Sequence, residues 1–196
     1  MNGGRFFAAL LAGALLLVAG CSGSKSDSDT ERTPATSETS TTVGTVGATP
    51  SIEAPVAPEA EKSAEGAEAF VRYFWDVHNY AYQTLETAPF ESIVEDDCTF
   101  CASTLADLKN AASRNASISG SEVSLTVVAV PPGKVGSRVV VATVITQNEG
   151  VESHPDGTKE TFPPIPATQS SIALQWTPSA QWVVHDISID DTDATQ

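Results

Sequence analysis

The clearest pattern in the chain is a run of apolar side chains at helical spacing that begins near residue 63. In the stretch SAEGAEAFVRYFWDVHNYAYQTLE, charged positions fall opposite the apolar ones. At about 100° per residue, one helix face collects the apolar positions: Ala67, Phe70, Val71, Phe74, Val77, His78, Ala81 and Leu85. Ser63 is a suitable N-cap, with Glu65 in the first turn. The pattern predicts a long amphipathic helix that lies against a broad surface.

Two further helical segments are predicted before the pattern changes. Residues 89–94 indicate a short helix or turn, and a third helix is expected from about 98 to 115, with Asp97 as its cap. Its inner positions would be Cys101, Leu105, Leu108 and Ala112. The stretch SISG at 117–120 is expected to be a break that ends the helical part.

After residue 120, apolar and polar positions alternate, as is typical of strands. Four antiparallel strands are expected, near residues 123–127, 139–145, 172–176 and 181–189. The PDG triplet at 155–157 predicts a hairpin turn. FPPIP at 162–166 cannot lie in a central strand and so marks a kink or an edge. The order predicts an α+β fold in which three N-terminal helices pack on a curved four-stranded antiparallel sheet.

The N-terminus carries a different pattern. Arg5 precedes an apolar stretch at 6–18, which spans about 20 Å as a helix and is too short for a bilayer core of about 30 Å. Residues 1–20 are therefore expected to be a signal peptide. LVAGC at 17–21 resembles the bacterial lipobox. The resemblance implies that Cys21 receives a diacylglyceryl group and becomes the mature N-terminus, where two acyl chains would anchor it firmly to the membrane. The alternative is an ordinary secretory signal with an incidental cysteine.

Composition divides the remainder of the chain. Residues 21–62 are rich in Ser, Thr and Pro and contain no aromatic side chain, so they are expected to form a disordered stalk. The folded domain is expected at 63–190, followed by a frayed tail at 191–196. Acidic residues outnumber basic ones 25 to 10, and the net charge of -15 argues against nucleic-acid binding.

Two sequence features together resemble a known group of proteins. The aromatic-rich helix AEAFVRYFWDVHNYAYQT and the DCTFC motif at 97–101 are similar to actinobacterial lipoproteins of unknown function. Their domain resembles the nuclear transport factor 2-like, or cystatin-like, cone, and the likeness covers roughly residues 63–189. The resemblance implies a cone-like fold and brings no activity with it, because that fold serves many functions.

Cys98 and Cys101 leave three interpretations open. An extracytoplasmic location and an expected Cα separation of about 5–6 Å favour a disulfide. A redox centre is disfavoured by the acidic residues at 95–97, since neighbouring anions oppose a thiolate. A metal site would need two further ligands, and the three histidines are scattered along the sequence. No metal or cofactor is expected.

His78 is the unusual member of the apolar stripe. A buried histidine can act as a general base in a cavity, whereas the simpler interpretation is a core histidine bonded to a backbone carbonyl. Candidate cavity residues are His78, Phe74, Tyr73 and Trp176. No catalytic triad, phosphate loop or nucleotide motif accompanies them.

The run VVVATVI is apolar on both faces, and helices can cover one of them. Val140, Ala142 and Val144 would occupy the other face, to be covered by residues 162–166, by a second copy or by a partner protein. The sequence therefore predicts a membrane-anchored extracytoplasmic lipoprotein with a binding or interaction domain. The alternatives are an enzyme with His78 as base and a redox protein acting through Cys98 and Cys101.

Overall fold

The computed structural model describes residues 52–133 and 135–190, and its longest helix is the one that the apolar stripe predicts. Helix α1 (Ala64–Thr84) begins at Ser63, whose hydroxyl accepts the N–H of Gly66 at 2.9 Å. It ends at Leu85, which adopts the left-handed conformation with φ 61°. The predicted stripe is buried from Ala67 to Ala81, so the N-cap and the inner face are both confirmed.

The other two helices differ in detail from the prediction. Helix α2 (Ala88–Glu91) is a single turn, and α3 (Thr99–Ser113) begins one residue later than expected. The cap of α3 is Cys98 and not Asp97: its sulfur accepts the N–H of Cys101 at 3.2 Å. The buried positions are Cys101, Thr104, Leu108 and Ala111, so the prediction of Ala112 was wrong.

The strands form two antiparallel sheets instead of the single four-stranded sheet that the alternation predicted. The larger sheet has the order β2-β3-β6-β7 and corresponds to the four predicted strands. Its members are β2 (Val123–Ala129), β3 (Arg138–Gln147), β6 (Ile165–Trp176) and β7 (Trp182–Ile189). Register shifts interrupt the pairing of β2, β6 and β7 with their neighbours, and such irregularities bend a sheet.

The second sheet has the order β1-β4-β5. It consists of β1 (Ser117–Gly120), β4 (Gly150–Ser153) and β5 (Lys159–Phe162). SISG is therefore a strand and not a break. These strands are short and mostly polar, so they carry little of the apolar alternation on which strand prediction depends.

The sequence predicted two interruptions of the strands, at 155–157 and at 162–166, and both can be compared with the structure. The predicted hairpin at 155–157 joins β4 to β5, where the His154 N–H donates to the Thr158 carbonyl at 2.9 Å and Gly157 has φ 87°. Pro163 and Pro164 lie between β5 and β6, where the chain passes from the small sheet to the large one. Ile165 and Pro166 nevertheless belong to β6, which lies between β3 and β7, so the expectation that 162–166 cannot lie in a central strand was wrong for these two residues.

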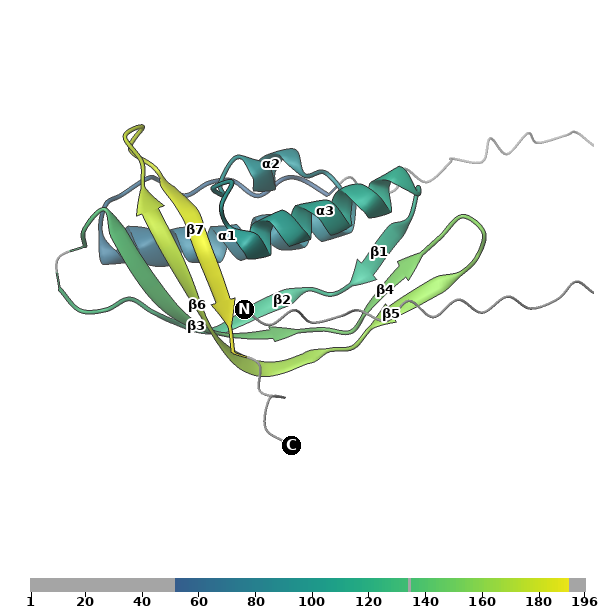
Figure 1. Ribbon diagram of the computed structural model, residues 1–196. Helices are drawn as coiled ribbons and strands as arrows, with labels where there is room; N and C mark the ends of the chain where they lie inside the picture. The colour runs from purple at the N-terminus through teal and green to yellow at the C-terminus, as the bar shows by residue number, and fades with distance from the viewer. Residues whose placement is uncertain (1–51, 134, 191–196) are drawn as a thin grey trace, which may run out of the picture. The chain divides into compact units, whose positions relative to one another are not determined.

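The helices lie on one face of the sheets (Figure 1). α1 contacts β1, β2 and β3, while α3 contacts β7. Phe100 of α3 packs edge-on against Trp75 of α1, with ring centroids 6.1 Å apart. Inward side chains of the large sheet complete the core: Val141, Ile145, Ile172, Leu174 and Val184. This is the α+β arrangement that the sequence predicted.

Residues 52–62, which composition assigned to the stalk, have no regular secondary structure and are mostly exposed, but residues 57–61 contact the domain. The Trp182 indole donates to the carbonyl of Glu61 at 2.8 Å. A Cβ on Gly66 would lie 2.1 Å from that same carbonyl oxygen, so the close approach requires glycine. The folded part therefore begins before the boundary that composition placed at residue 63.

The signal peptide, Cys21, residues 22–51 of the predicted stalk and the predicted tail lie outside the described residues. Among the helices described within 52–133 and 135–190, none has both the length and the apolar character needed to cross a membrane.

Candidate functional site

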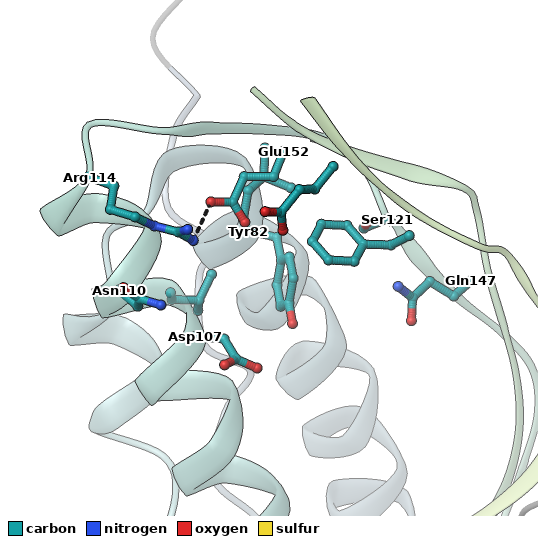
Figure 2. A pocket seen from close by; sticks show the side chains of 11 residues that line it. Tyr82, Asp107, Asn110, Arg114, Ser121, Gln147 and Glu152 are labelled. Atoms are coloured by element: carbon teal, nitrogen blue, oxygen red, sulfur yellow. Dashed lines mark hydrogen bonds and ion pairs between the residues drawn. The ribbon is translucent and has the colours of Figure 1, made fainter. Parts of the chain in front are cut away.

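A pocket of about 420 Å³ opens between the helices and the small sheet (Figure 2). α1 contributes Tyr82, α3 contributes Leu108, and β1 contributes Ile118. Phe162, at the end of β5, adds a second aromatic ring to the apolar part of the wall. The volume lies within the range of about 300–1,000 Å³ that is usual for small-molecule sites.

The principal charged group of the pocket is a buried carboxylate. Glu152 lies in β4, is 5% exposed and accepts a hydrogen bond from Arg114 Nη2 at 2.7 Å. Arg114 is the C-cap of α3, so this pair links the helix to the small sheet (Figure 2). His154 Nε2 lies 3.7 Å from the same carboxylate. Burial of a carboxylate is costly unless it is paired, and Arg114 supplies the partner.

Ser121 supplies the second polar feature. Its side chain is buried, and its hydroxyl has no hydrogen-bond partner in the described part of the protein. The residue adopts a left-handed φ of 64° and lies against Gly150, where any Cβ would meet the hydroxyl oxygen at 1.6 Å. An unpaired buried hydroxyl is destabilising, and this oxygen is closed to solvent where it lies against Gly150.

Tyr82 and Asp107 complete the polar lining on the helix side (Figure 2). Burial raises the pKa of the Tyr82 phenol, and the Asp107 carboxylate adds to the rise. The phenol therefore stays protonated and can donate a hydrogen bond. Carboxylates outnumber the one arginine around the pocket, since Glu160 also lines it. The site suits a molecule that combines an apolar body with hydrogen-bond donors or a positive charge.

His78 lies outside this pocket, in the interior between α1, α2 and α3. Its ring stacks on Tyr82 at 4.6 Å and meets Trp75 at 5.1 Å, Phe90 at 6.0 Å and Phe100 at 6.3 Å. Nδ1 has no partner among the described residues, and burial lowers the pKa of His78 to about 4. No acid converges on the imidazole there, and the surrounding rings leave no place for a substrate.

The other three candidate cavity residues are also placed elsewhere. Phe74 is fully buried in the core against Trp75 and Phe90. Trp176 packs edge-on against Trp182, with centroids 5.0 Å apart. Tyr73 lines a second hollow, of about 340 Å³, between residues 57–60 and α1. The structure thus brings none of the four into the pocket.

Sequence reasoning missed the polar residues that do line the pocket. Glu152 falls in a strand that was not predicted, and Ser121 follows a stretch that was interpreted as a break. One available signal was the alternation of Gly150, Glu152 and His154, which in a strand would share one face.

The cysteine pair forms a disulfide at the start of α3, with Cα atoms 5.2 Å apart. The geometry agrees with the bridge that the sequence favoured. Both cysteines are buried, Cys98 completely. Thiol exchange requires access to a sulfur atom, so the redox alternative gains no support from this arrangement.

The described residues form an α+β domain with an open pocket between its helices and its small sheet. The chain belongs to a family of unknown function (DUF6318), whose model matches residues 52–188. The match begins at the segment that packs against α1, and it agrees with the predicted resemblance to proteins of unknown function. No protein of curated function matches the chain.

Several solved structures are distantly similar. The intermembrane space region of the chloroplast protein ARC6 matches with TM-score 0.44 and 13% identity, covering 67% of this chain and 98% of that one. ActVI-ORFA from Streptomyces coelicolor matches with TM-score 0.40 and 13% identity, covering 64% and 98%. An NTF2-like protein with a cystatin-like fold from Novosphingobium aromaticivorans matches with TM-score 0.38 and 11% identity, covering 64% and 81%.

Proposed function

We propose that the domain binds a small amphipathic molecule in the pocket between α1, α3 and the small sheet. The observation that carries this proposal is a pocket whose wall combines apolar side chains with the buried Glu152 carboxylate. Phe162 and Ile118 would contact the apolar body of a ligand. The Glu152 carboxylate, held by Arg114, would accept hydrogen bonds from its polar end.

The test is an NMR titration of the ¹⁵N-labelled protein with three matched probes: phenethylamine, phenethyl alcohol and 3-phenylpropanoate. The amine is expected to bind best because carboxylates dominate the lining. The backbone amides of Ser121 and Gln147 should shift in a saturable way. Ile118→Trp should fill the pocket and abolish binding.

Ser119→Ala is the matched control, because Ser119 is exposed on the neighbouring strand β1. It should bind the probes as the wild type does. Shifts scattered over the surface, or shifts that persist unchanged in Ile118→Trp, would show that the pocket is not a binding site.

We further propose that the protein is an extracytoplasmic lipoprotein anchored through Cys21. The lipobox-like LVAGC motif supports this location, as does a disulfide, which persists in oxidising compartments. Metabolic labelling with an alkyne fatty acid should mark the wild-type chain and not Cys21→Ser. Equal labelling of the two would contradict the proposal.

We also propose that the domain self-associates through the outer face of the large sheet. Val140 is 53% exposed there, so residues 162–166 do not cover it. Arg138 and Asp186 are the charged side chains of this face within the described strands. A twofold copy would bring opposite charges together across a surface of short side chains.

Sedimentation velocity tests this interface. The wild type should dimerise, and Val140→Asp should shift it to a monomer because a carboxylate would be buried at the contact. Ala112→Asp, an equal charge change on the exposed face of α3, should leave the dimer intact. A wild-type protein that stays monomeric at all concentrations would exclude self-association.

A further inference from the structure

Three potential metal ligands converge at the junction of the α2–α3 loop and β7. They are Glu95, Asp97 and His185, whose ligand atoms all lie within 4.8 Å of one another. His185 Nδ1 lies 2.6 Å from Glu95 Oε2 and 3.7 Å from Asp97 Oδ1. Sequence reasoning did not find this group, because Glu95 and His185 lie 90 positions apart in the chain.

The backbone holds the two segments in fixed register. Val94 and Val184 form an isolated parallel bridge. The Glu95 N–H donates to the Val184 carbonyl, and the Val184 N–H donates to the Ile93 carbonyl, each at 2.9 Å. On the other side of the group, the Cys98 N–H donates to the Glu95 carbonyl at 3.2 Å. The backbone that carries Glu95 and His185 is therefore already in place for an ion to bind.

The electrostatics of the group are unbalanced. Two carboxylates share one imidazole, and neither makes an ion pair with a lysine or arginine in the described part of the chain. Nearby Lys109 pairs instead with Glu91, at 2.8 Å. The 3.7 Å separation of Asp97 from Nδ1 is too long for a hydrogen bond. A divalent cation would neutralise both carboxylates and also accept the lone pair of Nδ1.

We propose that Glu95, Asp97 and His185 form a binding site for a divalent transition metal of the zinc type. Zinc bonds of about 2.0–2.2 Å to nitrogen and oxygen place neighbouring tetrahedral ligands roughly 3.3 Å apart. The observed separations of 2.6 Å and 3.7 Å lie on either side of that value. One nitrogen and two oxygens favour zinc over calcium, which takes 6–8 oxygen ligands. The ion would clamp the entry of α3 to the last strand.

The experiment is a calorimetric titration of the EDTA-treated full chain with Zn²⁺. All proteins carry Cys21→Ser, so that no free thiol competes for the metal. The expected result is one saturable equivalent of Zn²⁺, and binding that millimolar Ca²⁺ does not displace. His185→Gln and Asp97→Asn should each weaken the affinity by about tenfold or more. Long-range ¹H–¹⁵N spectra should show Zn²⁺ shifting Nδ1 of His185.

Two variants serve as matched controls. His154→Gln removes a histidine from the β4–β5 hairpin, and Asp186→Asn removes the carboxylate next to His185 that is exposed on the outer face. Both should keep the wild-type affinity. Asp97 is exposed, so Asp97→Asn keeps the test valid if His185→Gln fails to fold. Absence of a saturable equivalent, or full affinity in Asp97→Asn together with an unmoved His185 Nδ1 signal, would overturn the proposal.

Discussion

Among the described residues, the Trp75 indole, Nδ1 of His78 and the Ser121 hydroxyl are buried without hydrogen-bond partners. His78 is enclosed by aromatic rings, and burial keeps its imidazole neutral. Ser121 is a lining residue of a pocket that also contains a charged pair, and its hydroxyl lies against Gly150. The sequence singled out His78, because a histidine in an apolar stripe is conspicuous. It passed over Ser121, because one serine in a polar stretch carries no signal, and only tertiary structure shows whether the space beside a residue is filled.

His78→Phe should make the protein more resistant to acid. Burial lowers the pKa of His78 to about 4 in the folded protein from its ordinary value of 6.5, so the unfolded chain takes up the proton first. Wild-type stability therefore falls as the pH drops from 6.5 towards 4, by about 3 kcal/mol at most. Urea unfolding at pH 7 and pH 4.5 measures the difference between the two proteins.

The phenylalanine variant should lose this component of the pH dependence, while Tyr82→Phe should retain it. Tyr82 is the matched control because its ring stacks on His78 but does not titrate in this range. Parallel pH profiles for wild type and His78→Phe would mean that the imidazole accepts a proton in the fold.

The secondary-structure elements differ in how far the sequence determined them. α1 has an N-cap, a first-turn acid and a buried stripe that agree with one another, so local pattern was sufficient to predict it. The strands of the small sheet are four residues long and are defined by pairing, with β4 between β1 and β5. The β4–β5 hairpin is local, and its turn was predicted, but the pairing of β1 with β4 joins distant segments and leaves no local trace, which is why the sheet as a whole escaped prediction.

Asn79 connects two of these elements with a single side chain. Its amide donates to the Val123 carbonyl at 2.9 Å and accepts the Val123 N–H at 2.8 Å, so that α1 completes the pairing at the start of β2. Asn79→Ala should cost about 1–3 kcal/mol, because both backbone groups lose their partner. Urea unfolding measures the cost. Gln83→Ala, exposed on the same helix, should change stability little, and equal costs for the two variants would refute the bridging role.

At the scale of the whole described domain, composition misplaced the beginning of the fold. Residues 52–62 lack aromatic side chains and contain prolines, which is typical of a linker. The end of this segment nevertheless contacts α1 and β7, because the partners that hold Glu61, Gly66 and Trp182, belong to the domain itself. The α+β class followed from element order, whereas this packing depends on a contact 121 residues apart in sequence.

Gly66→Ala should destabilise the protein, although Gly-to-Ala inside a helix normally stabilises it by about 0.5–1 kcal/mol. The new methyl group would meet the Glu61 carbonyl oxygen at 2.1 Å and displace residues 57–62. Limited proteolysis should then cut before residue 63 more rapidly, and thermal unfolding should begin at a lower temperature. Trp182→Phe, which removes the hydrogen bond to Glu61, should also speed cleavage there. A more stable Gly66→Ala protein would show that the segment yields without cost.

The contact between Glu61 and Trp182 also decides how the domain responds to mechanical load. A pull on the chain ahead of residue 52 reaches the folded part at this contact before it reaches the first turn of α1. Tension is therefore divided between the opening helix and the final strand. Under force, the hydrogen bond from Trp182 to Glu61 should break first, while β7 is still hydrogen-bonded to β6.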